Sequence, residues 1–267
     1  MAEKSDSTET RPNVVWMFSD QHRGQAMSCA GDVNVQTPNM DRLAAEGVWF
    51  RQARSGFPLC CPARGSILTG RYPHRCVPGH EMRLPGDATT IADVFNEAGY
   101  DTAYFGKWHL DGASGHPHDV AAHLVPRDRR GGFKTWLGYE NINAQFDCHV
   151  HGHRGDDEVP RYRLPAFETD ALTDLLVKHL EQNKTAAQPF FAALSVQPPH
   201  DPYTAPAEWM ARHHPARLQL RDNVPPIAAV REQARRDRQP LNDGTPLGEA
   251  PHQHHTKHHQ HHELGRG

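Results

Sequence analysis

Short hydrophobic runs that alternate with amphipathic segments dominate most of the chain. An unbroken apolar run of β-favouring residues covers residues 14–18, and similar runs follow at 102–105 and 190–196. Runs of this kind are typical of strands that are buried on both faces of a parallel sheet. A further strand is predicted to begin at residues 48–50.

Four segments between these runs carry apolar residues at helical spacing. Thr37 and Pro38 suit the start of the first helix, and Gly47 suits its end. Thr90 with Asp93 resembles a capping box at the start of the third. The predicted helices cover residues 38–46, 60–70, 90–98 and 169–182.

Helices that alternate with buried strands predict an α/β fold with a largely parallel sheet. We expect Met40 and Leu43 of the first helix to pack against the core. The same expectation holds for Ile67 and Leu68 of the second helix. Residues 110–165 are rich in Gly, His, Arg and Asp, have little periodicity, and are predicted to form long loops over the site.

Composition divides the chain into three parts. Of its 267 residues 37% are hydrophobic, which is a low fraction for one well-packed domain. Hydrophobic residues are scarcest at 231–267, where histidines crowd together, and such a segment cannot bury enough apolar surface to offset its ordering entropy. We predict a disordered N-terminus at 1–10, one folded domain at 11–230 and a disordered His-rich tail at 231–267.

Charge and cysteine content exclude several classes of protein. The net charge of -3 gives no reason to expect nucleic acid or an anionic membrane as a partner. No apolar stretch approaches the ~20 residues of a membrane span, and the polar N-terminus lacks the centre of a secretory signal. The five cysteines are odd in number and scattered, unlike a disulfide framework or a structural zinc site. A cytoplasmic protein is the expectation.

Four polar residues follow predicted strands: Asp20, Lys107, His109 and His200. Sites in open α/β sheets are built at the carboxyl ends of the strands, so these side chains are candidates for one site. Asp20 could hold a hard divalent cation there, although a turn residue at a strand end has the same appearance. His200 follows two prolines that fix its position, whereas an isolated histidine is more often a surface residue.

Cys60 directly precedes a helix that begins near a proline. The free N–H groups and positive dipole end of such a helix stabilise an anion, whether a thiolate or a bound sulfate. Arg64 lies four residues on, so one helical turn brings its guanidinium towards the same end. A buried cysteine pair beside a surface arginine is the alternative that this pattern alone leaves open.

The segment Cys60-Cys61-Pro62-Ala63-Arg64 through Leu68-Thr69-Gly70-Arg71 resembles the sulfatase signature, Cys-x-Pro-x-Arg followed by Leu-Thr-Gly-Arg. Other segments resemble the same family in the same order, at residues 12–20, 37–44, 106–109 and 198–200. The chain is therefore similar to the formylglycine-dependent sulfatases of the alkaline-phosphatase-like superfamily, from about residue 11 to about residue 226. Within the domain predicted at 11–230, the resemblance implies the N-terminal part of a catalytic domain.

The resemblance implies a role for each catalytic candidate. Cys60 is converted by a separate maturation enzyme to formylglycine, whose hydrated aldehyde attacks sulfur as a covalent nucleophile. Arg64 lies beside that nucleophile, and Lys107 contacts the sulfate. His109 orients or deprotonates the diol, and His200 contacts the ester and assists the leaving group.

The resemblance also implies a cofactor, a substrate and a partner. Asp20, Gln21 and the modified Cys60 are ligands of a divalent metal, calcium first, with magnesium or manganese as alternatives. Gln21 is an amide where the family commonly has a second acidic ligand. The substrate is a small-molecule or carbohydrate sulfate ester, and the partner is a formylglycine-generating maturation enzyme.

The later metal ligands of the family, an Asp-His or Asp-Asn pair followed by Gly, have no clear counterpart. Asp222 and Asn223 precede Val-Pro-Pro, and residues 242–244 lie in the polar tail. We therefore expect a truncated N-terminal portion with little turnover even when Cys60 is converted. Three hypotheses follow: a sulfuric ester hydrolase, a truncated inactive fragment, and a phosphonate or phosphate ester hydrolase of the same superfamily.

Overall fold

The computed structural model describes residues 11–213, 217–225, 228–229 and 232. Contacts along the chain divide it into two units, Met1–Arg217 and Leu218–Gly267. The segments predicted at 1–10 and 231–267 lie outside the described residues, apart from Glu232. Their predicted disorder therefore stays a prediction.

The described part of the second unit is short. Asp222 and Asn223 form a turn in which the amide of Val224 donates to the carbonyl of Arg221 at 2.9 Å. Leu220 just before the turn is exposed. The described residues of this unit contribute no strand to the sheet described below.

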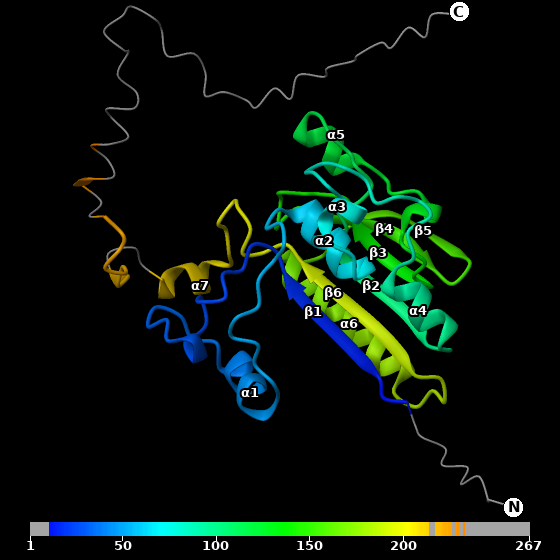
Figure 1. The fold of residues 1–267 in the computed structure, drawn as a ribbon, viewed down its shortest axis with the longest axis horizontal. Helices are drawn as coiled ribbons and strands as arrows, with labels where there is room; N and C mark the ends of the chain where they lie inside the picture. The colour runs from blue at the N-terminus through cyan, green and yellow to red at the C-terminus, as the bar shows by residue number, and fades with distance from the viewer. Residues whose placement is uncertain (1–10, 214–216, 226–227, 230–231, 233–267) are drawn as a thin grey trace, which may run out of the picture. The chain divides into compact units, whose positions relative to one another are not determined.

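The first unit contains a six-stranded sheet in the order β1-β6-β2-β3-β4-β5 (Figure 1). Its strands are β1 (Val14–Ser19), β2 (Asp101–Lys107), β3 (Thr135–Tyr139), β4 (His149–Arg154), β5 (Asp157–Arg163) and β6 (Phe190–Val196). β1, β6, β2 and β3 are parallel to one another, and β4 and β5 continue the sheet antiparallel. The α/β fold with a largely parallel sheet is confirmed.

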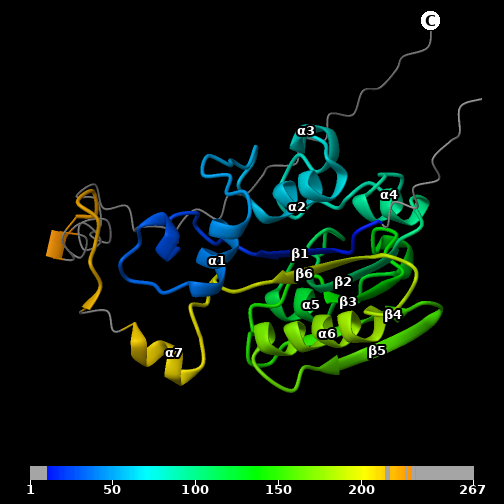
Figure 2. The same cartoon turned by 90° about the horizontal axis from the view of Figure 1, so that it is seen from below.

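Helices lie on both sides of the sheet. The described helices are α1 (Pro38–Glu46), α2 (Cys60–Thr69), α3 (Pro73–Cys76), α4 (Ile91–Glu97), α5 (Pro117–Ala122), α6 (Glu168–Asn183) and α7 (Ala207–Arg212), with 3₁₀ turns η1 (Ser28–Ala30) and η2 (Arg127–Arg129). Figure 2 shows α2, α3 and α4 on one side of the sheet and α6 on the other. Among the described helices, none is both long enough and apolar enough to cross a membrane.

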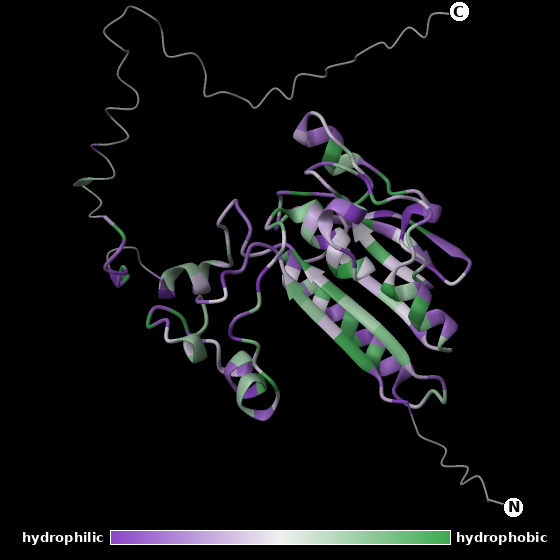
Figure 3. Cartoon of the chain, in the orientation of Figure 1, coloured by the Kyte–Doolittle hydropathy of each residue, from purple (hydrophilic) through white to green (hydrophobic). Residues whose placement is uncertain are grey.

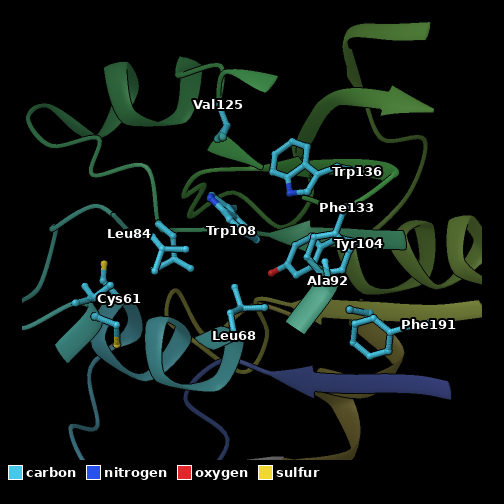
Figure 4. Close-up of a cluster of buried hydrophobic side chains, with 14 of the residues drawn as sticks. Cys61, Leu68, Leu84, Ala92, Tyr104, Trp108, Val125, Phe133, Trp136 and Phe191 are labelled. Carbon is cyan, nitrogen blue, oxygen red and sulfur yellow. The ribbon is translucent and has the colours of Figure 1, made fainter. Parts of the chain in front are cut away.

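Successive residues of the central strands point to opposite faces of the sheet and therefore belong to two different hydrophobic clusters. Tyr104 and Phe191 belong to the cluster that packs under α2 and α4 (Figure 4). Phe105 and Ala192, their neighbours in sequence, belong to the second cluster, with Leu172 of α6. The two central strands are therefore buried on both faces, which explains their unbroken apolar runs.

The predicted elements of the parallel core are largely confirmed. β1, β2 and β6 contain the three long apolar runs, and α1, α2, α4 and α6 match the predicted helices closely. The capping box is present, because Thr90 Oγ1 accepts from the Asp93 amide and Asp93 Oδ2 accepts from the Thr90 amide at 2.8 Å. Thr37 precedes α1 but does not cap it, because its Oγ1 donates to Asp41 Oδ1 at 3.0 Å instead.

The prediction of long loops over residues 110–165 is wrong. Strands β3, β4 and β5 lie within this range, together with α5 and η2. In β4 the side chains of His151 and His153 are polar yet buried, because they have partners elsewhere in the chain. His153 in β4, for example, contacts Arg130 through Nδ1 at 2.8 Å and the carbonyl of Phe133 through Nε2 at 2.9 Å.

Two further expectations about packing are wrong. Residues 48–50 form no strand and leave both Val48 and Phe50 exposed. In α1 the side chains of Met40 and Leu43 are exposed, so this helix buries no apolar stripe among the described residues. In α2 Leu68 is buried as predicted, but its neighbour Ile67 is exposed.

Candidate active site

Helix α2 places Cys60 at its first position. Leu59 precedes it in an extended conformation and supplies no side-chain cap, so the first amides of the helix are left for other acceptors. The helix lies very close to its neighbour α3 and the residue that follows it. An added Cβ on Gly65 would lie 2.5 Å from Val77 Cγ2, so only glycine permits this approach.

Asp20, directly after β1, joins three of the predicted site residues. Cys60 Sγ lies 3.4 Å from its Oδ1. Its Oδ2 accepts a hydrogen bond from Arg64 Nη2 at 3.1 Å and forms an ion pair with Lys107 Nζ at 2.8 Å. Residues from β1, α2 and β2 thus meet at the carboxyl ends of the parallel strands, where sites of open sheets are built.

The Arg64 guanidinium is fixed by a second set of contacts. Its Nη1 donates to the carbonyl of Lys107 at 2.7 Å and to Ser195 Oγ at 2.9 Å. Ser195 Oγ in turn donates to the same Lys107 carbonyl at 2.9 Å. Both cations are almost completely buried, which rules out the surface arginine of the alternative interpretation.

The charges of this cluster leave an excess of positive charge. Burial alone would raise the pKa of Asp20, but the opposing effect of Arg64 and Lys107 is larger in sum, so the pKa lies well below its ordinary value. Asp20 is therefore ionised over the physiological range. One carboxylate faces two buried cations, and such a surplus attracts an anion such as a sulfate group.

The Cys60 thiol is not activated by these surroundings. Burial raises its pKa, Lys107 lowers it and Asp20 raises it again, and the net shift is upwards. The expectation that the helix end stabilises a thiolate is therefore wrong. A raised pKa leaves little of the thiolate, which is the nucleophilic form of cysteine.

His109 lies two residues after Lys107, but the chain between them is not extended. His109 has a φ of 53°, a left-handed conformation that is uncommon outside glycine. Its ring packs edge-on against His80, with 5.5 Å between ring centroids. Burial, followed by the charges of Lys107 and Arg64, lowers the pKa of His109 to about 2, so the ring is neutral.

His200 approaches the cluster from the end of β6. Its Nδ1 lies 2.7 Å from the carbonyl oxygen of Asp201, so Nδ1 carries the proton of that hydrogen bond. Ligand atoms of Asp20, Cys60 and His200 all lie within 4.8 Å of one another. The structure thus places His200, from a distant part of the chain, at the first residue of α2.

A cavity of about 400 Å³ opens above this group. The residues that line it are Phe18, Ser19, Asp20, Gln21, His22, Ser55, Pro58, Leu59, Cys60, Ala63, Arg64, Ile67, His80 and His200. Lys107 and His109 lie behind this lining, Lys107 against Asp20 and His109 against His80. The catalytic roles that the resemblance implies for all these residues stay predictions.

The donors fit part of a divalent cation shell. Asp20, Cys60 and His200 form a candidate metal-binding triad, and Gln21 lies beside it on the cavity wall. A calcium ion takes roughly six to eight oxygen ligands. Asp20 and Gln21 supply carboxylate and amide oxygens, but Asp20 Oδ2 already serves Arg64 and Lys107. The described residues therefore account for one side of such a shell.

Sequence reasoning missed three residues near the site. Ser195 anchors Arg64, and its signal is a lone hydroxyl within the apolar run of β6. His80 and His22 line the cavity, but neither stands in a pattern that distinguishes it from a surface histidine. Their positions depend on how distant loops fold over the strand ends.

Comparison with known proteins gives one consistent family. The model of the Sulfatase family matches residues 12–238. An ulvan-active sulfatase of Formosa agariphila is 38% identical over 224 residues, which cover 81% of this chain and 41% of that protein.

Solved structures give the same result. The YidJ protein of Bacteroides fragilis superposes with a TM-score of 0.65 at 27% identity, over 75% of this chain and 46% of that one. A protein solved with its substrate D-glucosamine-2-N,6-O-disulfate superposes with a TM-score of 0.60 at 29% identity, over 73% and 36%. The chain thus spans less than half the length of these relatives.

Proposed function

Because the chain belongs to the sulfatase family, we propose that it hydrolyses sulfuric esters at Cys60. The observation that carries this proposal is the contact of Cys60 Sγ with Asp20, whose carboxylate also holds Arg64 and Lys107. A nucleophile at the edge of a buried positive cluster suits attack on an anionic ester.

Each residue around Cys60 has a separate role in this proposal. A formylglycine made from Cys60 supplies, when present, the hydroxyl that attacks the ester sulfur. Arg64 reaches the cavity and binds the sulfate oxygens, and Lys107 adds positive charge from behind Asp20. We assign His109 to orient the attacking hydroxyl rather than to accept its proton, because burial lowers the pKa of His109 to about 2 and makes the ring a weak base. His200 donates a proton to the alcohol oxygen that leaves.

We assign the cofactor as a divalent cation, calcium first, with magnesium or manganese as alternatives. Asp20 and Gln21 are its proposed protein ligands, together with the oxygen that replaces Cys60 Sγ after conversion. When bound, the ion neutralises charge on the sulfate group. Hard oxygen donors at this position favour calcium over a soft metal.

A carbohydrate sulfate ester is the proposed substrate. This assignment rests on the names of similar proteins, which include an ulvan-active sulfatase and a structure with D-glucosamine-2-N,6-O-disulfate as substrate. A formylglycine-generating enzyme is the proposed maturation partner, and the signature that it acts on begins at Cys60.

Mass spectrometry and sulfate release test the function together. Co-expression with a formylglycine-generating enzyme should make the Cys60 peptide lighter by the difference between cysteine and the aldehyde. The converted chain should release sulfate from carbohydrate sulfate esters in the presence of calcium, magnesium or manganese. Cys60→Ala should abolish release, whereas Cys29→Ala, a half-buried cysteine away from the cavity, should keep it.

Two outcomes would contradict the proposal. Converted protein that releases no more sulfate than Cys60→Ala would favour the hypothesis of an inactive fragment. Faster hydrolysis of a phosphonate monoester than of any sulfate ester would favour the alternative hydrolase of the same superfamily.

A further inference from the structure

A second cavity, of about 610 Å³, adjoins the candidate active site. His200 lines both cavities, so one side chain forms part of the wall between them. The rest of the second cavity is built from the start of α6, the proline-rich segment after β6, and α7. A substrate whose sulfate group lies at Cys60 would extend past His200 into this space.

The wall of the second cavity is held by a buried side chain. Gln145 is almost completely buried, and its Nε2 donates to the carbonyl of Pro202 at 3.3 Å. Thr204 Oγ1 donates to Gln145 Oε1 at 3.2 Å. Both ends of one amide therefore fix the segment that carries Tyr203, which is itself exposed at the cavity.

The lining combines flat aromatic surfaces with a few polar groups. Trp209 and Tyr203 are 49% and 75% exposed, which leaves ring surface free for a ligand. The guanidinium of Arg212 lies over one face of the Trp209 ring, 4.2 Å from its centroid, so the other face is the one open to a ligand, with positive charge nearby. Thr169 Oγ1 is buried without a hydrogen-bond partner among the described residues, and the exposed Asp170 offers a carboxylate.

We propose that this second cavity binds the pyranose ring of the alcohol part of the sulfate ester, with Trp209 as its stacking surface. A pyranose has an apolar face that fits an aromatic ring and hydroxyl groups that need polar partners such as Thr169 and Asp170. Arg212 adds attraction for the negative charges of a sulfated saccharide. The inference rests on the proposed function, because the sulfate group at Cys60 is what directs the ring past His200.

Binding measurements test this inference separately from turnover. The probes are inorganic sulfate, a panel of pyranose 2-, 4- and 6-sulfates, and the unsulfated parent sugars, each titrated by calorimetry into the full chain. Wild type is compared with Trp209→Ala and with Trp49→Ala. Trp49 is the matched control, because it also lies next to an arginine, Arg51, at 5.1 Å, but lies outside both cavities.

We expect at least one pyranose sulfate to bind more tightly than inorganic sulfate. Trp209→Ala should weaken the binding of that pyranose sulfate by about tenfold, which is the loss typical of an aromatic ring contact. The affinity for inorganic sulfate should not change. Trp49→Ala should change neither affinity. Pyranose sulfates that bind no better than inorganic sulfate, or equally well to Trp209→Ala, would overturn the inference.

The experiments can overturn the proposed function and leave the inference standing, or overturn the inference and leave the function standing. The function alone would be overturned if the wild-type chain neither binds inorganic sulfate nor releases sulfate, while the parent sugars bind to it and bind more weakly to Trp209→Ala. Sulfate release and sulfate binding that persist without any contribution from Trp209 would overturn the inference alone.

Discussion

Asp20 carries one negative charge between two buried cations, and the balance of these three charges defines the site. Its carboxylate contacts both Arg64 and Lys107, which offsets part of the cost of removing their charges from water. The remaining positive charge is directed at the cavity through Arg64. Cys60 lies at the open side of this group with its thiol protonated, so chemical conversion of that side chain is what the proposed function requires.

His109 should make folding stability depend on pH. Its pKa is about 2 in the folded chain, against an ordinary value of 6.5, so below pH 6.5 the unfolded chain binds a proton that the folded chain does not. The stability that its neutral form permits is complete above pH 6.5 and is lost as pH falls towards 2, at about 1.4 kcal/mol per pH unit.

Urea unfolding between pH 6.5 and pH 5 measures this dependence. His109→Gln should flatten the decline of the unfolding free energy by about 1.4 kcal/mol per pH unit. His118→Gln is the control, because that side chain is 86% exposed, and it should leave the slope unchanged. Equal slopes in wild type and His109→Gln would contradict the prediction.

At the scale of elements, the site depends on how closely α2 approaches its neighbours. Gly65 faces Val77 and Cys76 at distances that leave no room for a side chain. The same helix carries Cys60 at its first position and Arg64 one turn later. A displacement of the helix would therefore move Cys60 and Arg64 together.

Gly65→Ala should destabilise the protein, although alanine normally stabilises a helix interior by about 1 kcal/mol relative to glycine. The added Cβ must push Val77 away, and overpacking of this kind costs about 1–3 kcal/mol. Chemical denaturation of a double-mutant cycle measures it. In a Val77→Ala background the same substitution should cost less, because the methyl at 2.5 Å is gone and only the Cβ at 3.0 Å and Cys76 Sγ at 3.3 Å remain close. A Gly65→Ala variant more stable than the wild type would refute the close approach.

The parallel strands could be predicted from sequence because their burial on both faces leaves a local signal. β2 and β6 are central strands, and their apolar runs report that position directly. β4 gives no such signal, because its buried side chains include His151 and His153. His151 accepts from the Val125 amide through Nε2 at 2.9 Å, a partner that only the folded chain brings near.

The site shows the same division. Cys60, Arg64 and Asp20 stand in motifs whose order along the chain resembles the family, so their convergence could be expected. Ser195 and His80 could not be assigned in that way, because their importance comes from tertiary contacts with Arg64 and His109. Sequence motifs identify the groups that carry chemistry, whereas the groups that hold them appear only in the structure.

At the scale of the whole molecule, the first unit presents an open sheet edge at β1. β1 pairs with β6 alone among the described strands. Figure 3 shows most of β1 in the green of hydrophobic residues. Val14, Trp16 and Phe18 pack against the hydrophobic core, but Val15 and Met17 between them are exposed. The helix α6 contacts β6 and β2 and leaves this face of β1 uncovered.

An exposed apolar edge strand favours pairing with another chain, so the 267-residue protein should self-associate through β1. Met17→Lys puts a charge on the uncovered face of that strand and should slow association without much loss of stability, because Met17 is 57% exposed. Light scattering and size-exclusion chromatography over a range of protein concentrations measure the effect. Val94→Lys is the matched control, since it adds the same charge at a 55% exposed position on α4, away from the edge. If both variants slow association equally, net charge rather than the β1 edge governs it, and the edge has no special part in self-association.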